Sequence, residues 1–174
     1  AQRLGFLTSL VSNGILLEDH VSEASAFDYV LCTIEGDQAS HDRQRGPGTW
    51  QSTIRGLQEL KRLGRSKLGL ICAVHRDNVD SLDTPIRLAR ELDAKVFFQP
   101  VQIRDGWRGR PFENTLTQKE ITETFARLEA GKKRGLPIGN SARHFELVRK
   151  GASRDMKESC LAGRYFFTVL PHGD

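Results

Sequence analysis

Polar side chains that could bind a ligand follow each of four short apolar runs in the sequence. Serine and threonine hydroxyls can both donate and accept hydrogen bonds, and amide and imidazole groups offer further polar contacts. If the four runs are parallel strands, their carboxyl ends meet at one edge of the sheet, where α/β proteins gather their chemistry. The sequence therefore predicts one site, made from Ser12-Asn13-Gly14, Thr33-Ile34-Glu35-Gly36, Val74-His75-Arg76 and Gln99-Pro100-Val101.

Several of these residues also have a purely structural interpretation. Asn13-Gly14 is a common turn pair, and Ser12 could cap the helix that follows it. Thr33 is β-branched and could belong to the core of its strand. Asn78 is expected to cap the next helix. Gln99 precedes a proline that ends ladder pairing, so its side chain is expected to face the cavity.

A metal site and a disulfide framework are both disfavoured. His41 and Asp42 stand among other acidic residues, but no third well-spaced ligand accompanies them, so these groups are expected to be hydrated or to cap helices. Cys32 and Cys72 lie inside apolar runs, where a buried small hydrophobic side chain is the default. Three cysteines cannot form a disulfide framework, which favours a reducing, cytoplasmic setting.

Strands and helices must alternate along the chain to position this site. The expected strands, at Phe6–Val11, Tyr29–Ile34, Leu68–Val74 and Lys95–Val101, are almost continuously apolar, as strands buried on both faces are. One helix between them has Trp50, Ile54, Leu57 and Leu60 on one face and ends at Gly64; the next carries Leu82, Ile86, Ala89 and Leu92. This alternation predicts an α/β fold with a parallel sheet.

The rest of the chain is predicted to be mostly helical after a polar loop at Gln102–Asn114. Thr117-Gln118-Lys119-Glu120 has the pattern of a capping box and predicts a helix that buries Ile121, Phe125 and Leu128. A shorter helix is expected from Ser141, with Phe145 and Val148 buried, and one β-like run at Tyr165–Leu170.

The charge pattern disfavours nucleic acid as a partner. The net charge is +4, but the 26 Lys and Arg residues are scattered among 22 acids, which is typical of a solvated surface. The longest apolar runs are strand-sized and much too short to span a bilayer, and no signal peptide or lipidation motif is visible. We therefore expect no membrane partner.

The motif order resembles that of the radical S-adenosylmethionine (SAM) family. The resemblance covers about residues 6–104 and rests on Ser12-Asn13-Gly14, Thr33-Ile34-Glu35-Gly36, His41-Asp42-Arg43-Gln44-Arg45-Gly46 and His75-Arg76-Asp77-Asn78. The peptide- and cofactor-maturing branch of that family has Thr-Asn-Gly and Ser-Leu-Asp-Gly…His-Asp-x-x-Arg-Gly at these places. The resemblance implies a partial (β/α)6 barrel, from about its third strand to its sixth.

The resemblance also implies an activity and a set of binding residues. Family members reduce SAM with one electron from a [4Fe–4S] cluster and release a 5′-deoxyadenosyl radical that abstracts hydrogen from a peptide or small-molecule substrate. By motif position, Ser12 and Thr33 would lie beside the ribose and methionine of SAM, with further contacts from Asn13, Glu35, Gly36 and Gln99. Thr33 keeps the hydroxyl of the usual Ser, whereas Glu35 is longer than the usual Asp. Arg45 would contact a carboxylate or phosphate, or brace its loop.

The C-terminal part resembles the start of a SPASM domain, which is an auxiliary-cluster extension of these enzymes. The likeness rests on Cys160-Leu161-Ala162-Gly163-Arg164-Tyr165 and on Gly173, and a linking region of the same enzymes resembles 132–141. It implies that Cys160 ligates an auxiliary iron–sulfur cluster in the intact protein. We thus expect a partial barrel over 1–116, a last barrel helix and linking region over 117–155, and a SPASM-like start over 156–174.

The CxxxCxxC segment that ligates the catalytic cluster is absent from the sequence, and so is the Gly-Gly-Glu-Pro stretch that holds the SAM amine. Both ends are expected to be cuts through a longer enzyme, and the chain alone is expected to be inactive. An intact enzyme would need an electron donor. Two alternatives stay open: a degenerate barrel that acts as a binding module, and an unrelated α/β-barrel enzyme. The latter would require a Schiff-base lysine or a glycine-rich phosphate loop at a strand end, and neither is seen.

Overall fold

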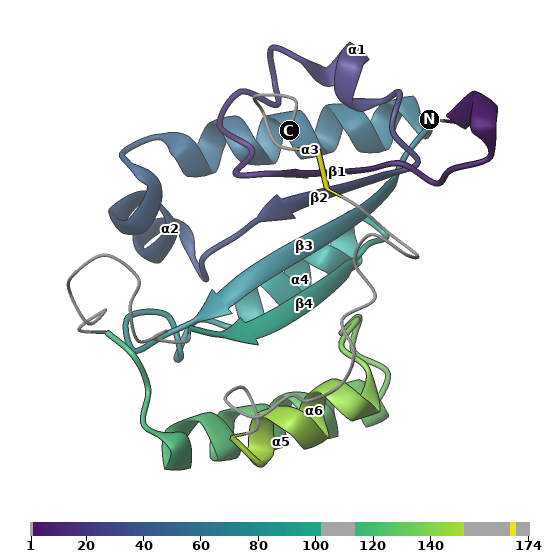
Figure 1. Cartoon of the computed structure of the whole chain (residues 1–174). Coiled ribbons are helices and arrows are strands. Elements are labelled where there is room, and N and C mark those ends of the chain that lie inside the picture. The colour runs from purple at the N-terminus through teal and green to yellow at the C-terminus, as the bar shows by residue number, and fades with distance from the viewer. Residues whose placement is uncertain (1, 102–113, 152–167, 170–174) are drawn as a thin grey trace.

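Four parallel strands form one sheet in the computed structural model, in the order in which they occur along the chain (Figure 1). The structure describes residues 2–101, 114–151 and 168–169. The strands are β1 (Ser9–Ser12), β2 (Tyr29–Thr33), β3 (Lys67–Val74) and β4 (Lys95–Pro100). The predicted α/β class, with a parallel sheet, is confirmed.

Three of the four predicted strands begin and end within a residue of the observed ones, but the first begins later than predicted. Phe6 and Leu7 precede β1 and are 49% and 78% exposed. The ladder starts where Ser9 pairs with Tyr29, just after Thr8, whose backbone N–H and hydroxyl donate to Asp28 Oδ2 over 2.7 and 2.8 Å. A long-range polar contact therefore sets the start of the strand, and an apolar run cannot reveal it.

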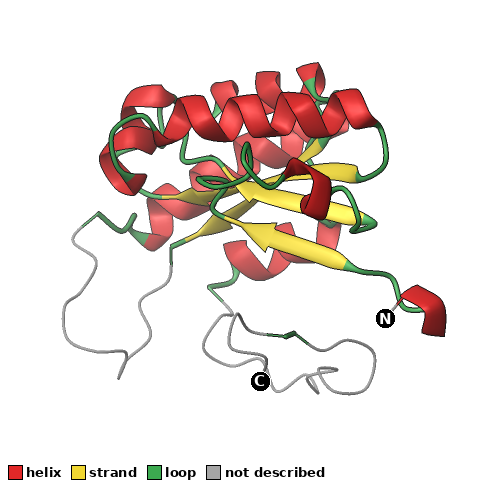
Figure 2. Cartoon of the chain, turned by 90° about the horizontal axis from the view of Figure 1, so that it is seen from above, coloured by secondary structure: helices red, strands yellow, loops and turns green. Residues whose placement is uncertain are grey.

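Six α-helices accompany the sheet in the described part of the chain. The longer ones are α3 (Thr49–Leu63), α4 (Asp83–Glu91) and α5 (Gln118–Lys133), and the shorter ones are α1 (Val21–Ala24), α2 (Gln38–Arg45) and α6 (Ala142–Arg149). In Figure 1, α4 lies behind β3 and β4, and α5 and α6 lie side by side below β4. Figure 2 shows the same sheet and helices from above. A short 3-10 helix, Gln2–Leu4, lies apart from them.

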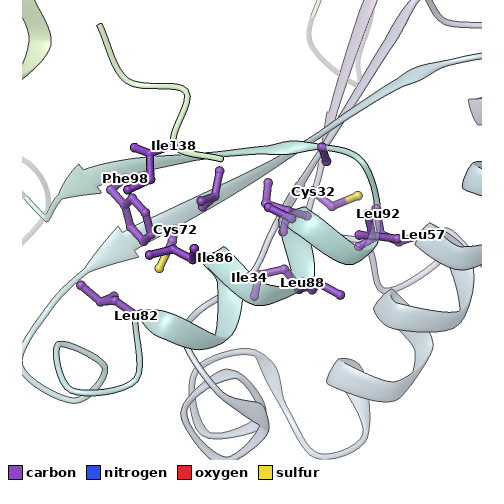
Figure 3. Close-up of a cluster of buried hydrophobic side chains, with 14 of the residues drawn as sticks. Cys32, Ile34, Leu57, Cys72, Leu82, Ile86, Leu88, Leu92, Phe98 and Ile138 are labelled. Carbon is purple, nitrogen blue, oxygen red and sulfur yellow. The ribbon is translucent and has the colours of Figure 1, made fainter. Parts of the chain in front are cut away.

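Alternate strand residues point into the core between sheet and helices. Val30, Cys32, Leu70 and Cys72 have no exposed surface, whereas Leu31 is only partly buried. Figure 3 shows the side chains of α4 against those of β3 and β4, with Phe98 beside Ile138. The opposite face carries, by register, Leu31, Thr33, Ile71, Ala73, Phe97 and Gln99.

The predicted helix ends follow local capping chemistry. Gly64 ends α3 with a left-handed φ of 64°, as predicted for a glycine that follows the last helical residue. The capping box at the start of α5 is present: the Thr117 hydroxyl accepts from Glu120 N, and Glu120 reaches back to Thr117 N over 2.7 Å. These hydrogen bonds lower the pKa of Glu120 to about 2, with help from Arg76.

Like the short α1, helix α2 was not predicted from the sequence. Its cap is Asp37, whose Oδ1 accepts from Ser40 N over 2.8 Å, and Gly46 follows its last residue. These two end signals were available in the sequence, but α2 lacks the apolar stripe that marks the other helices.

No helix among the described residues is long and apolar enough to cross a membrane. The β-like run at Tyr165–Leu170 lies almost entirely outside the described residues.

Candidate functional site

The carboxyl ends of the four strands meet at one edge of the sheet, as the parallel register requires. Register aligns Thr33 with Ile71 and Gln99 with Ala73, so Thr33 and Gln99 lie on the same face, on either side of β3. Thr33 is partly buried and Gln99 is exposed. The structure therefore brings these two predicted residues to one face at one edge.

Ser12 and Asn13 form a tight turn at the end of β1. The Ser12 hydroxyl accepts from Gly14 N over 3.0 Å, and Asn13 Oδ1 accepts from Ile15 N over 3.2 Å. Ser12 is paired in register with the buried Cys32, which precedes Thr33 in β2. Ser12 therefore lies on the face of the sheet opposite to Thr33. The Ser12 side chain stabilises this turn and does not cap a helix. Because its hydroxyl acts as an acceptor in the turn, the hydroxyl can still donate a hydrogen bond to a ligand.

Gly14 holds this turn close to α3. Its φ is +80°, and a Cβ added there would lie 2.5 Å from Thr53 Cγ2, so only glycine fits without displacing the helix. Thr53 is fully buried, and its hydroxyl has no hydrogen-bond partner among the described residues. Sequence analysis did not identify Thr53, because nothing local in the sequence shows that it faces Gly14.

Glu35 is buried and makes an ion pair, so its carboxylate does not face the open edge. The side chain is 2% exposed, and Arg45 Nη2 donates to its Oε1 over 2.5 Å. Of the two roles considered for Arg45, the structure shows the bracing one, because this contact ties α2 to the end of β2. Any contact of Glu35 with a ligand at the edge would come from its backbone.

His41 supports the same loop from inside the protein. Its Nδ1 accepts from Glu35 N over 3.2 Å, the ring is fully buried, and Trp50 packs edge-on with ring centroids 5.6 Å apart. Burial lowers the pKa of His41, and the Arg45 charge adds to this effect against the opposing charge of Asp42. His41 is therefore a buried group that supports the loop through its Nδ1. Among the described residues, no three possible metal ligands lie together.

Gly36 passes close to the turn that follows β3. Its φ is +86°, and a Cβ there would overlap the Ser81 hydroxyl and lie 3.0 Å from Asn78 Cβ. Asn78 does not cap α4, contrary to prediction. Its Oδ1 accepts from His75 N over 3.0 Å and its Nδ2 donates to Ala73 O over 2.7 Å, so it closes the turn after β3 instead.

The two cysteines of the described strands are not suited to ligating iron. Burial raises the pKa of Cys32 to about 12 and also raises that of Cys72, with Glu35 adding to the shift at Cys72. A cluster ligand must be a thiolate, which these buried thiols resist forming. Both are buried small side chains, as predicted. Cys160, the predicted auxiliary-cluster ligand, lies outside the described residues.

Comparisons with known proteins agree with the motif resemblance. No family model matches the chain. The sequence is 28% identical over 169 residues to the mycofactocin maturase MftC of Mycolicibacterium smegmatis, a match that covers 94% of this chain and 42% of that protein. The chain thus spans less than half the length of this curated relative.

Solved structures share the fold. The structure of native anSMEcpe with bound AdoMet and the Cp18Cys peptide superposes with a TM-score of 0.56 at 18% identity, over 75% of this chain and 39% of that one. The same protein with AdoMet alone gives a TM-score of 0.56 at 19% identity and the same coverage. The four-stranded sheet therefore shares the fold of part of that structure, and the similarity to a maturase agrees with the resemblance of the motifs to the SPASM-containing branch of the radical SAM family.

Proposed function

We propose that this chain supplies the part of a radical SAM barrel that binds the ribose and methionine of SAM. One observation carries the proposal: Thr33 and Gln99 lie on one face at the carboxyl edge of the sheet, the edge at which β1 and β2 run into the turns at Gly14 and Gly36. Hydroxyl, amide and closely approaching backbone groups suit a polar sugar and an amino-acid moiety.

Each predicted residue has a role in this proposal. The Thr33 hydroxyl and the Gln99 amide contact SAM directly, and Ser12 and Asn13 contribute through their turn. Glu35 offers its backbone carbonyl, because its carboxylate is paired with Arg45 and its N–H donates to His41, and Gly36 offers its backbone as well. SAM, when bound, would supply the 5′-deoxyadenosyl group for hydrogen abstraction.

The described residues do not fit a [4Fe–4S] cluster, since their only cysteines are the buried Cys32 and Cys72. We therefore propose that the catalytic cluster of the intact enzyme is ligated by residues outside this sequence, and that Cys160 ligates an auxiliary cluster. We further propose that the intact protein works in peptide or small-molecule maturation, takes its electron from a separate donor and resides in the cytoplasm. Its relatives include a maturase and a protein solved with a bound peptide, which favours a peptide as the substrate.

A SAM titration of the isotopically labelled chain, followed by 1H–15N correlation spectra, tests the binding proposal. We expect the largest shifts at the Gly14, Gly36 and Gln99 amides. Thr33→Val removes one hydroxyl from the site and should weaken binding by about two- to tenfold, the value of one hydrogen bond. Ser9→Ala, at the amino end of β1, is the matched control and should bind as the wild type does. Shifts confined to the amino ends of the strands would contradict the proposal.

A further inference from the structure

The segment Pro137–Asn140 lies along the outer edge of β4, although it is not part of a named strand. Val96 N donates to Pro137 O over 2.9 Å, and Gly139 N donates to Val96 O over 2.8 Å. Ile138 thereby forms a parallel bridge to Val96, and Figure 3 shows Ile138 next to Phe98. The segment covers an edge that would otherwise present unpaired backbone groups.

Asn140 continues this pairing with its side chain. Its Oδ1 accepts from Phe98 N and its Nδ2 donates to Phe98 O, both over 2.8 Å, and the residue is 4% exposed. One amide side chain thus satisfies both outward-facing backbone groups of Phe98, as a neighbouring strand would. The next outward position of β4 is Pro100, which has no N–H to satisfy.

Two further sets of contacts hold the segment in place, one from α5 and one from β4. Lys132 Nζ donates to Ile138 O over 3.2 Å and to Asn140 O over 2.6 Å. Gly139 packs on the ring of Phe97, because a Cβ there would lie 2.5 Å from Phe97 Cζ. The segment therefore contacts three consecutive residues of β4, and the residue that follows them is Gln99.

We propose that Asn140 is a positioning residue for Gln99 in the proposed SAM site, an inference that rests on the proposed function. The carbonyl of Phe98 and the N–H of Gln99 belong to one planar peptide group, so holding the carbonyl orients the start of Gln99. Pro100 restricts Gln99 from the other side, because the residue before a proline is held in extended conformations. Asn140 and Pro100 together set the direction in which the Gln99 side chain leaves β4.

A double-mutant cycle on SAM binding tests this role, using the same titration. Asn140→Ala should weaken SAM binding about fivefold in the wild-type background, but change it by less than about 1.5-fold in a Gln99→Ala background, because coupled residues are not additive. Hydrogen exchange at the Phe98 amide should become at least about tenfold faster in Asn140→Ala, since that amide loses its acceptor. Asn114→Ala is the control for loss of an asparagine amide and should leave SAM binding unchanged.

Lys132→Met and Lys133→Met form a second, milder pair in case Asn140→Ala fails to fold. Lys132 holds the segment, whereas Lys133 is the next residue and its side chain is 74% exposed. Lys132→Met should speed hydrogen exchange at the Phe98 amide, and it should weaken SAM binding only while Gln99 is present. Lys133→Met should change neither.

The outcomes separate this inference from the proposed function. An equal loss of affinity from Asn140→Ala with and without Gln99 would overturn the positioning role and leave Asn140 as a structural residue. If Thr33→Val weakens SAM binding but Gln99→Ala does not, the site exists without Gln99 and the inference fails alone. If SAM causes no shifts at the carboxyl edge, the proposed function itself fails.

Discussion

Replacing Arg45 with methionine should destabilise the protein far more than neutralising its partner Glu35. The Glu35 side chain is 2% exposed and Arg45 is 32% exposed, so the two partners depend on each other unequally. Arg45→Met leaves a buried carboxylate without its cation, and its second oxygen, Oε2, already has no partner among the described residues. Removing one member of a buried pair in this way costs about 3–5 kcal/mol.

Glu35→Gln should cost much less. The carboxamide keeps an oxygen that can accept from Arg45, and the guanidinium can reach water on its exposed side. We expect a loss of about 1 kcal/mol, as for one hydrogen bond. The double variant Glu35→Gln/Arg45→Met has no buried charge and should be more stable than Arg45→Met alone, by about 1–2 kcal/mol.

Urea denaturation followed by far-ultraviolet circular dichroism measures these differences. Arg43→Met is the matched control, because Arg43 is an exposed arginine of the same helix, and its loss should be within about 0.5 kcal/mol of zero. If Arg45→Met costs less than about 1 kcal/mol, or no more than Glu35→Gln, the carboxylate is not held as a buried, paired group.

Three further predictions concern the close backbone turn, the buried histidine and the missing cluster. Gly36→Ala should destabilise the chain by about 2–4 kcal/mol in the same assay, from left-handed strain and overlap with Ser81, whereas Gly48→Ala, with φ +80° and open space around it, should show only the strain of about 1–2 kcal/mol. His41 has a pKa below its unfolded value of 6.5, so the unfolded chain binds its proton first and stability falls as pH drops below about 6.5. His41→Gln should flatten that fall by up to about 1.4 kcal/mol per pH unit in urea titrations at several pH values, and an unchanged slope would show that His41 protonates freely when folded. Finally, anaerobic reconstitution of this chain with iron and sulfide should give neither the visible charge-transfer absorption of a cluster at a catalytic site nor release of 5′-deoxyadenosine from SAM. Detecting both would refute the prediction that the chain alone is inactive.

The sequence by itself determined the parallel sheet, the positions of three strands and the ends of some helices, and it predicted where a site would lie. Continuous apolar runs predicted β2, β3 and β4 to within a residue. Gly64 predicted where α3 ends, and the capping box of Thr117 and Glu120 predicted where α5 begins. Such signals involve residues within about four positions of one another, so they can be read along the chain. Predicting a site at the strand ends required only that the strands be parallel.

Only the tertiary structure decided what each polar side chain contacts. Glu35 was expected to contact a ligand, but α2 brings Arg45 to its carboxylate, and α2 itself was not predicted. Asn140 was not identified at all, because its partner Phe98 is 42 residues earlier in the chain. A buried polar group must find a hydrogen-bond partner, but the packing of distant elements decides which one it finds.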